Sequence, residues 1–231
     1  MIFDNVQKVR ERIASACVKI GRDPSEVTLV AVSKTFSADK ITEAVREGLR
    51  DIGENYVQEL LRKKEEVADK NIKWHFIGHL QTNKVKYITE WIHLIHTVDT
   101  VDLARELDKR GAKADRVVDV LVEVNTTGEA TKYGIQPGKA IAFVESLKEF
   151  QHIRLGGLMT IGPFLPDPEC SRPMFRQLRL LKEKLAQLGQ ENVAMDHLSM
   201  GMTGDYEVAI EEGATTVRIG TAIFGSRKNQ S

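Results

Sequence analysis

Lys34 follows an apolar run that ends in Val32-Ser33, and its position suits a residue that forms Schiff bases. The run at 28–33 is expected to be a strand, and in α/β proteins the carboxyl ends of strands open onto the binding site. An amine held at the wall of such a cavity is partly desolvated, which lowers its pKa and frees it to attack a carbonyl group. On this position alone, a solvated lysine at the start of a loop is the more common case.

Two segments near the other end of the chain have the residue types of a phosphate site. Residues 199–203 (SMGMT) follow the seventh expected strand, and residues 218–222 (RIGTA) end the eighth. Phosphate sites in barrels are commonly built from these two loops. Either loop alone is compatible with an ordinary turn, but together they favour a phosphorylated ligand. Its expected contacts are the backbone at Gly201 and Gly220 and the hydroxyl groups of Ser199 and Thr221.

Other polar residues near strand ends have simpler interpretations. Asn55 follows the second expected strand, where it could contact a ligand or cap a helix. His75 and His79 lie four residues apart on a strand and its exit, not on one helix, so no metal site is predicted. His96 and His197 lie inside expected strands and are predicted to be packed.

The elements that must position these residues alternate along the chain. Short apolar runs, several of them continuous, indicate parallel strands that are covered on both faces. Between them, apolar residues at helical spacing predict helices, and one extra helix precedes the first strand. The strands are expected at 28–33, 51–53, 74–78, 94–98, 117–124, 153–159, 195–199 and 216–220, and helices at 5–20, from Ser37 to Gly48, 102–110, 173–188 and 207–212.

Eight strand–helix units in about 200 residues predict a single-domain α/β protein, a (β/α)8 TIM barrel that occupies residues 1–231. A doubly wound open sheet is the alternative architecture. No linker separates a second domain, because the stretch at 162–168 is short and lies where a loop belongs.

Composition limits the possible partners and surroundings. The 33 Lys and Arg residues balance 33 Asp and Glu, which argues against electrostatic capture of nucleic acid or of an anionic membrane. Two cysteines cannot form a disulfide framework, no apolar stretch approaches ~18 residues, and the N-terminus lacks the pattern of a signal peptide. A cytoplasmic protein is expected.

The same segments resemble the YggS/PROSC family of pyridoxal phosphate homeostasis proteins, called PLPBP in animals. The resemblance runs from the first helix to Gly225 and is specific, because many blocks occur in order. Those blocks are VSKT (32–35), GENYVQE (53–59), HFIG (75–78) with LQ (80–81) and NK (83–84), SMGM (199–202) with Asp205, and RIGTAIFG (218–225).

The resemblance implies a barrel like the N-terminal domain of alanine racemase that holds pyridoxal 5'-phosphate (PLP) as its cofactor. Lys34 would form the internal aldimine, and Arg218 would face the pyridine nitrogen. Asn55 would lie near the ring substituents, and Ser199, Gly220 and Thr221 would hold the phosphate, beside the glycine at Gly201. Family members are thought to buffer and deliver PLP and to affect the balance of amino and keto acids, with no established catalytic reaction.

Chemistry gives an independent reason to expect a binding protein that is not an enzyme. PLP withdraws electrons most strongly when its pyridine nitrogen is protonated, and a cationic Arg218 would disfavour that proton. Racemisation also needs a second acid or base, which racemases take from another domain and subunit. The eight units leave only residues 226–231, so no such domain is expected and a monomer is plausible.

Two enzymatic alternatives remain open at the level of sequence. One is a PLP-dependent racemase or lyase of small amino acids, with Tyr56 or Tyr133 as the acid. The other is a Schiff-base aldolase that acts on a sugar phosphate through the same lysine and needs no cofactor. The expected partners are PLP, other B6 vitamers, and apo-enzymes in transient contact.

Overall fold

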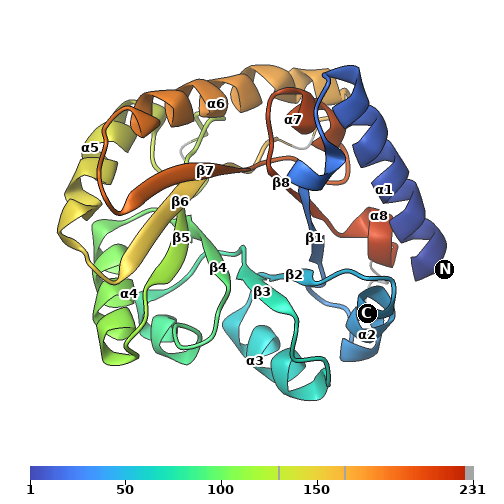
Figure 1. Cartoon of the computed structure of the whole chain (residues 1–231), viewed down its shortest axis with the longest axis horizontal. Coiled ribbons are helices and arrows are strands. Elements are labelled where there is room, and N and C mark those ends of the chain that lie inside the picture. The colour runs from blue at the N-terminus through green and yellow to red at the C-terminus, as the bar shows by residue number, and fades with distance from the viewer. Residues whose placement is uncertain (130, 164, 227–231) are drawn as a thin grey trace.

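Eight parallel strands close into a barrel in chain order, and the first strand pairs with the last (Figure 1). This computed structural model describes residues 1–129, 131–163 and 165–226. The closed ring confirms the predicted (β/α)8 barrel and excludes an open sheet. The strands are β1 (Thr28–Val32), β2 (Asp51–Glu54), β3 (Lys73–Phe76), β4 (Leu94–Val98), β5 (Val118–Glu123), β6 (Ile153–Met159), β7 (Val193–Ser199) and β8 (Thr216–Ile219).

Helices surround the strands, and their bounds follow the apolar periodicity closely. The α-helices are α1 (Ile2–Lys19), α2 (Ala38–Arg46), α3 (Val57–Glu66), α4 (Val101–Lys113), α5 (Ala140–Ser146), α6 (Arg172–Ala186), α7 (Tyr206–Glu211) and α8 (Thr221–Phe224). Short 3₁₀ helices are η1 (Pro24–Glu26), η2 (Thr82–Tyr87), η3 (Pro137–Lys139), η4 (Leu147–Glu149) and η5 (Pro168–Ser171). Within the described ranges, no helix is both long and apolar enough to cross a membrane.

One unit departs from the expected alternation. Between β3 and β4 the chain forms η2 in place of an α-helix. Val85 in η2 and Ile88 and Ile92 after it are all buried, so η2 and the residues that follow it still cover their part of the barrel. Burial of apolar side chains on both faces also explains why all five residues of β4 are buried.

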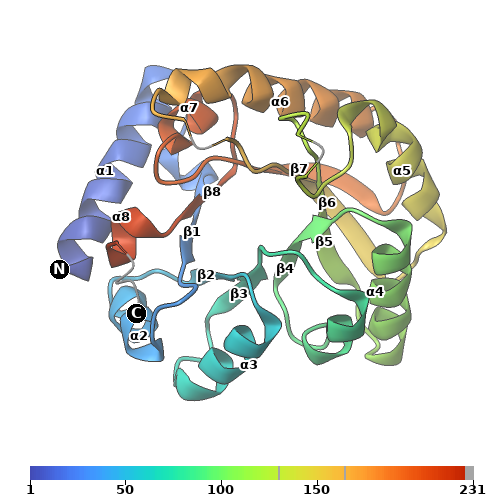
Figure 2. The same ribbon diagram turned by 180° about the vertical axis from the view of Figure 1, so that it is seen from behind.

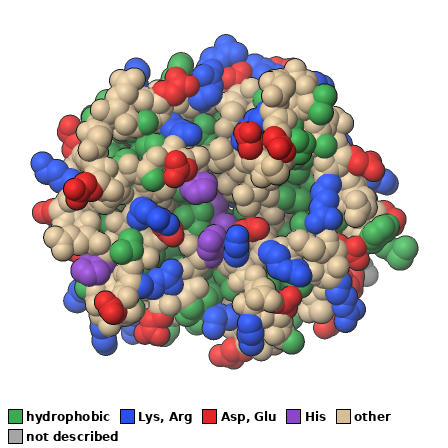
Figure 3. Space-filling model, in the orientation of Figure 1, with side chains coloured by type: hydrophobic (Ala, Val, Ile, Leu, Met, Phe, Trp, Pro, Cys, Tyr) green, Lys and Arg blue, Asp and Glu red, His purple; other side chains and the backbone are tan. Residues whose placement is uncertain are grey.

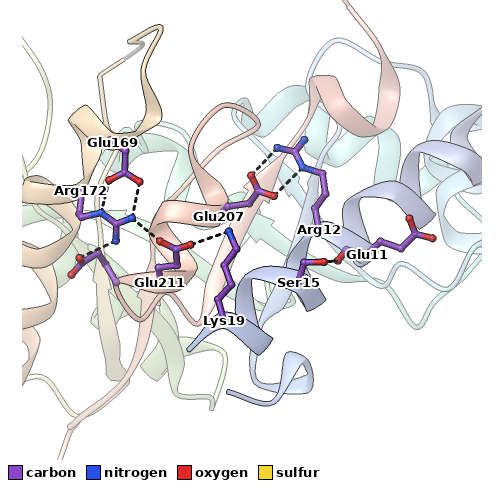
Figure 4. A network of polar contacts seen from close by, with 9 residues as sticks. Glu11, Arg12, Ser15, Lys19, Glu169, Arg172, Glu207 and Glu211 are labelled. Carbon is purple, nitrogen blue, oxygen red and sulfur yellow. Dashed lines mark hydrogen bonds and ion pairs between the residues drawn. The ribbon is translucent and has the colours of Figure 1, made fainter. Parts of the chain in front are cut away.

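The N-terminal helix α1 lies beside α7 and α8 and covers the place where the barrel closes (Figures 1 and 2). A polar network fixes α1 to α7 and to the start of α6 (Figure 4). Arg12 donates two hydrogen bonds to Glu207, Lys19 lies 3.5 Å from Glu211, and Arg172 lies 2.6 Å from the same Glu211. Single exposed pairs contribute little, but linked pairs keep the helix in register.

Candidate functional site

A pocket opens at the carboxyl ends of the strands, where polar residues from both ends of the chain meet. Five of the seven predicted cofactor residues line it: Lys34, Asn55, Arg218, Gly220 and Thr221. The structure adds residues that sequence reasoning did not assign to the site: Val32, Phe36, Ile77, Ile161, Met202, Thr203 and Gly204. The mixture of apolar walls and a few convergent polar groups is typical of a small-molecule site.

A buried lysine holds the backbone directly before Lys34. Lys63, on α3, is fully buried, and its Nζ donates to the backbone oxygen of Ser33 at 2.6 Å. The same Nζ lies 2.6 Å from Glu54 Oε1, which also accepts from the Ser33 hydroxyl at 2.5 Å. Burial raises the pKa of Glu54, and the charge of Lys63 opposes that rise. The buried ion pair therefore fixes the end of β1, from which Lys34 extends.

The residue after Lys34 is held in an unusual conformation. Thr35 has a φ of 70°, a left-handed conformation that is uncommon outside glycine. Its N–H donates to Glu59 Oε1 at 2.7 Å, and Glu59 in turn lies 2.7 Å from Lys63 Nζ. One cluster thus anchors the chain on both sides of Lys34, and the strain is compensated by charged hydrogen bonds.

Asn55 contributes an acceptor that is ready for a ligand. Its Oδ1 is buried and makes no hydrogen bond to any residue that the structure describes. Buried polar atoms nearly always have a partner, so this oxygen suits a donor group on a bound molecule. The backbone at Asn55 is also tightly packed, since a Cβ at Gly78 would lie 2.2 Å from its carbonyl oxygen. The acceptor is therefore held rigidly at the pocket wall.

Small residues and hydroxyl groups form the corner of the pocket between β7, β8 and α8. A Cβ added at Gly220 would lie 3.1 Å from the Val32 carbonyl oxygen, so the start of α8 approaches β1 closely. Thr203 Oγ1 is 3.5 Å from the N–H of Ala222 and lines the pocket beside Thr221. Thr203 ends the segment at 199–203, but no contact with the ligand was predicted for it from the sequence. The signal in the sequence that could have assigned Thr203 to the site is its hydroxyl group, two residues after Gly201.

Ser199 and Gly201 lie next to this corner and do not belong to the pocket lining. Ser199 is fully buried and its Oγ accepts from Arg218 Nη1 at 2.6 Å, so its assignment to a phosphate stays a prediction. Gly201 has a φ of 90°, and a Cβ there would lie 2.6 Å from Ala209 Cβ. Glycine at this position lets the loop pack against α7.

The carboxylate of Asp205 holds the loop after β7 by hydrogen bonds. Its carboxylate accepts from the N–H of Met202 at 2.7 Å and from the hydroxyl of Ser171 at 3.0 Å. Asp205 occupies the N-cap position of α7, but its side chain makes no cap hydrogen bond to that helix. Its side chain instead orders the pocket loop.

Arg218 is the charged centre of the pocket floor. It is 4% exposed, and its Nη2 donates to the backbone oxygen of Thr160 at 2.7 Å. Burial lowers the pKa of Arg218 to about 10, against the raising effect of Glu123 and Asp205. The guanidinium therefore remains cationic at neutral pH and presents only donors to a ligand.

Glu123, at the end of β5, should make stability depend on pH. Burial, with the nearby charge of Asp99, raises the pKa of Glu123 to about 7, and Arg218 opposes this. The folded form thus binds a proton more tightly than the unfolded form, so stability is full below the unfolded pKa and falls as pH rises towards the folded pKa. The loss is roughly 3 kcal/mol by about pH 8.

Urea unfolding at about pH 5 and about pH 8 measures this dependence. Glu123→Gln should flatten it, whereas Glu149→Gln, at an exposed acidic residue, should leave it as in the wild type. An equal pH dependence in the wild type and in Glu123→Gln would contradict the assignment.

Comparison with known proteins agrees with this geometry. The family model described as alanine racemase, N-terminal domain, matches residues 4–228, which defines the class of barrel. The chain is 48% identical to the pyridoxal phosphate homeostasis protein of Aquifex aeolicus, over 97% of this chain and 98% of that one. It belongs to the pyridoxal phosphate homeostasis protein family, as its sequence motifs predict.

Solved structures give the same result. An unknown protein from Bifidobacterium adolescentis superposes with a TM-score of 0.91 at 38% identity, covering 96% of this chain and 94% of that one. PipY of Synechococcus elongatus PCC7942, solved with PLP bound, has a TM-score of 0.82 at 34% identity and covers 94% and 100%.

Proposed function

We propose that this chain binds PLP and takes part in its homeostasis by buffering and delivering it, with residues 1–231 acting as one binding domain. The observation that carries this is the convergence of a lysine, an unpartnered buried amide oxygen and a cationic arginine in one pocket. The names of the relatives and the PLP-bound PipY structure support it.

The residues present fit PLP in type and in number. PLP supplies an aldehyde that an amine can attack and a pyridine ring that withdraws electrons. Lys34 is the residue for covalent attachment, and Asn55 Oδ1 accepts a hydrogen bond from the ring region. The hydroxyl groups of Thr221 and Thr203 and the backbone at Gly220 bind the phosphate, and Ser199 and Gly201 support this corner from below.

Arg218, taken together with the placement of the two candidate acids, supports binding over catalysis. A group that offers only donors cannot accept the proton of a protonated pyridine nitrogen, so the strongest electron-withdrawing form of the ring is disfavoured. The acids considered for a racemase or lyase, Tyr56 and Tyr133, are 60% and 58% exposed, and neither is among the lining residues. The ring of Tyr133 instead stacks on the ring of His79, with 3.9 Å between the two ring centroids.

The experiment that tests this function combines spectroscopy, reduction and transfer. Added PLP should give the protein a visible absorbance band. Borohydride should then attach one phosphopyridoxyl group permanently, and the peptide that contains Lys34 should gain the mass of that group. Loaded protein should restore activity to an apo form of a PLP enzyme. A colourless, unlabelled protein would overturn PLP binding and favour the cofactor-free aldolase. Rapid exchange of the Cα hydrogen of amino acids in heavy water would favour the racemase or lyase.

The finer assignments follow from the same proposal. Other B6 vitamers that carry the phosphate should bind more weakly where they lack the aldehyde, and contact with apo-enzymes is transient. Cys17 and Cys170 are free thiols, which suits a reducing compartment such as the cytoplasm. The pocket is built from one chain, so a monomer is sufficient for binding. Light scattering of the protein with and without PLP tests whether it is a monomer.

A further inference from the structure

A chain of hydrogen bonds crosses the inside of the barrel from the pocket to the opposite end. Arg218 Nη1 lies 2.6 Å from Ser199 Oγ, which lies 2.9 Å from His96 Nδ1. His96 Nε2 is 2.9 Å from His75 Nδ1, and His75 Nε2 is 3.0 Å from Asp51 Oδ1. Arg218, Ser199, His96 and His75 are each at most 4% exposed. The chain therefore runs through the core, linking residues of β8, β7, β4, β3 and β2.

With both imidazole rings neutral, the carboxylate end of this chain fixes its direction. Arginine can only donate, and an ionised carboxylate can only accept. Ser199 therefore accepts from Arg218 and donates its own proton to His96 Nδ1. His96 then carries its proton on Nε2 and donates to His75 Nδ1, and His75 Nε2–H donates to Asp51. With both rings neutral and protonated on Nε2, every link has one donor and one acceptor.

Electrostatics agrees with this arrangement. Burial lowers the pKa of His96 well below its ordinary value, so the central ring stays neutral. Burial raises the pKa of Asp51, but the hydrogen bond from His75 and the nearby charge of Lys73 bring it below its ordinary value. The carboxylate end of the chain is thus ionised, as the direction requires.

We propose that Asp51, His75, His96 and Ser199 are positioning residues for Arg218, acting as a one-directional hydrogen-bond chain that orients the guanidinium in the cofactor pocket. The chain also connects the pocket with a cavity at the amino ends of the strands. The inference rests on the proposed function only in taking Arg218 to face PLP. The chain itself is a property of the protein without any ligand.

The cavity at the amino ends of the strands is lined by the charged and titratable side chains around the Asp51 end of the hydrogen-bond chain. Figure 3 shows histidine side chains gathered near the centre of one face, beside Lys or Arg and Asp or Glu side chains. Asp51, His75 and His93 bring three possible ligand atoms within 4.8 Å of one another. Cationic Lys73 and Arg154 line the same cavity and oppose a divalent cation, so a proton between His75 and Asp51 fits better. The other charged and titratable lining groups are Asp119, Asp196 and His197.

Nitrogen-15 NMR of histidine-labelled protein tests the direction without PLP. His75 and His96 should both be neutral and protonated on Nε2 at neutral pH. An Nδ1-protonated form of either ring, or a charged His96, would overturn the proposal. This result does not depend on whether PLP binds, so its failure is distinguishable from failure of the proposed function.

Variants at the far end test whether positioning is transmitted. Asp51→Ala removes the terminal acceptor, and we expect altered NMR signals from the His96 ring and the Arg218 guanidinium. PLP affinity should also fall by about fivefold, the effect of ~1 kcal/mol. Asp51→Asn retains an acceptor oxygen and should restore the wild-type signals. Asp119→Ala is the matched control, because Asp119 lines the same cavity outside the chain.

Signals from His96 and Arg218 that respond equally to Asp51→Ala and Asp119→Ala would overturn the proposal. If Asp51→Ala does not fold, the histidine spectra of the wild type and of Asp51→Asn still decide the question. Loss of the Nε2-protonated forms in Asp51→Asn would count against it.

Discussion

A Lys34→Ala variant is expected to lose completely the visible absorbance band of the lysine–PLP Schiff base. Alanine has no amine, so no covalent attachment forms, and borohydride should leave the protein mass unchanged. The groups at Gly220, Thr203 and Thr221 remain, so weak binding of the phosphate should persist. Absorbance titration and mass spectrometry measure the two effects separately.

The fold should survive this change, because the buried cluster of Lys63, Glu54 and Glu59 contacts the backbone beside Lys34. A matched control is Lys40→Ala on α2, where the lysine pairs with Glu43 at the surface. It should keep full absorbance and labelling. A Lys34→Ala protein that still shows the visible band would overturn the role of Lys34 and direct attention to another amine.

Replacement of Lys63 by methionine is expected to destabilise the protein by ~3–5 kcal/mol. The methionine fills similar space, but Glu54 and Glu59 lose the cation that compensates them, and the Ser33 carbonyl loses its donor. Glu54 should then take up a proton, since burial already raises its pKa. The large effect comes from leaving Glu54 either charged without its cation or protonated at neutral pH, and this cost exceeds what the intact pair contributes.

Urea unfolding of three variants checks this. Arg62→Met, on the same helix but in an exposed pair with Glu66, should change the free energy of unfolding by less than ~1 kcal/mol. The double variant Glu54→Gln with Lys63→Met should recover part of the loss, because the buried charge is removed. If Lys63→Met is as stable as Arg62→Met, then the cluster is not the anchor of β1.

Sequence patterns predicted the barrel well, because the apolar runs of its strands and the helical spacing of its apolar residues are both local features. The run at 94–98 is β4 residue for residue, and Leu178, Leu181 and Leu185 of the predicted helix 173–188 lie on the buried face of α6. The loops at 199–203 and 218–222 converge because parallel strands end at one side of a barrel. That argument needs only strand order, which the chain supplies.

The supports of the site could not be predicted in the same way. Lys63 reads as an exposed helical lysine four residues after Glu59, yet it reaches Ser33, thirty residues earlier. His96 was predicted to be packed and its burial is confirmed, but its partner Ser199 is 103 residues away. Such contacts depend on which side chains point into the barrel together, and spacing along one strand does not reveal this.

Closure of the barrel has a consequence for when the cofactor can be held. Lys34 follows the first strand, whereas Arg218 lies on the last strand and Gly220 directly follows it, and β1 pairs directly with β8. During synthesis the lysine emerges early, but the phosphate corner is completed only when the final strand docks. A nascent chain should therefore be unable to retain PLP. Once folded, a ligand that spans this junction should bind the two ends of the chain together and oppose opening of the ring.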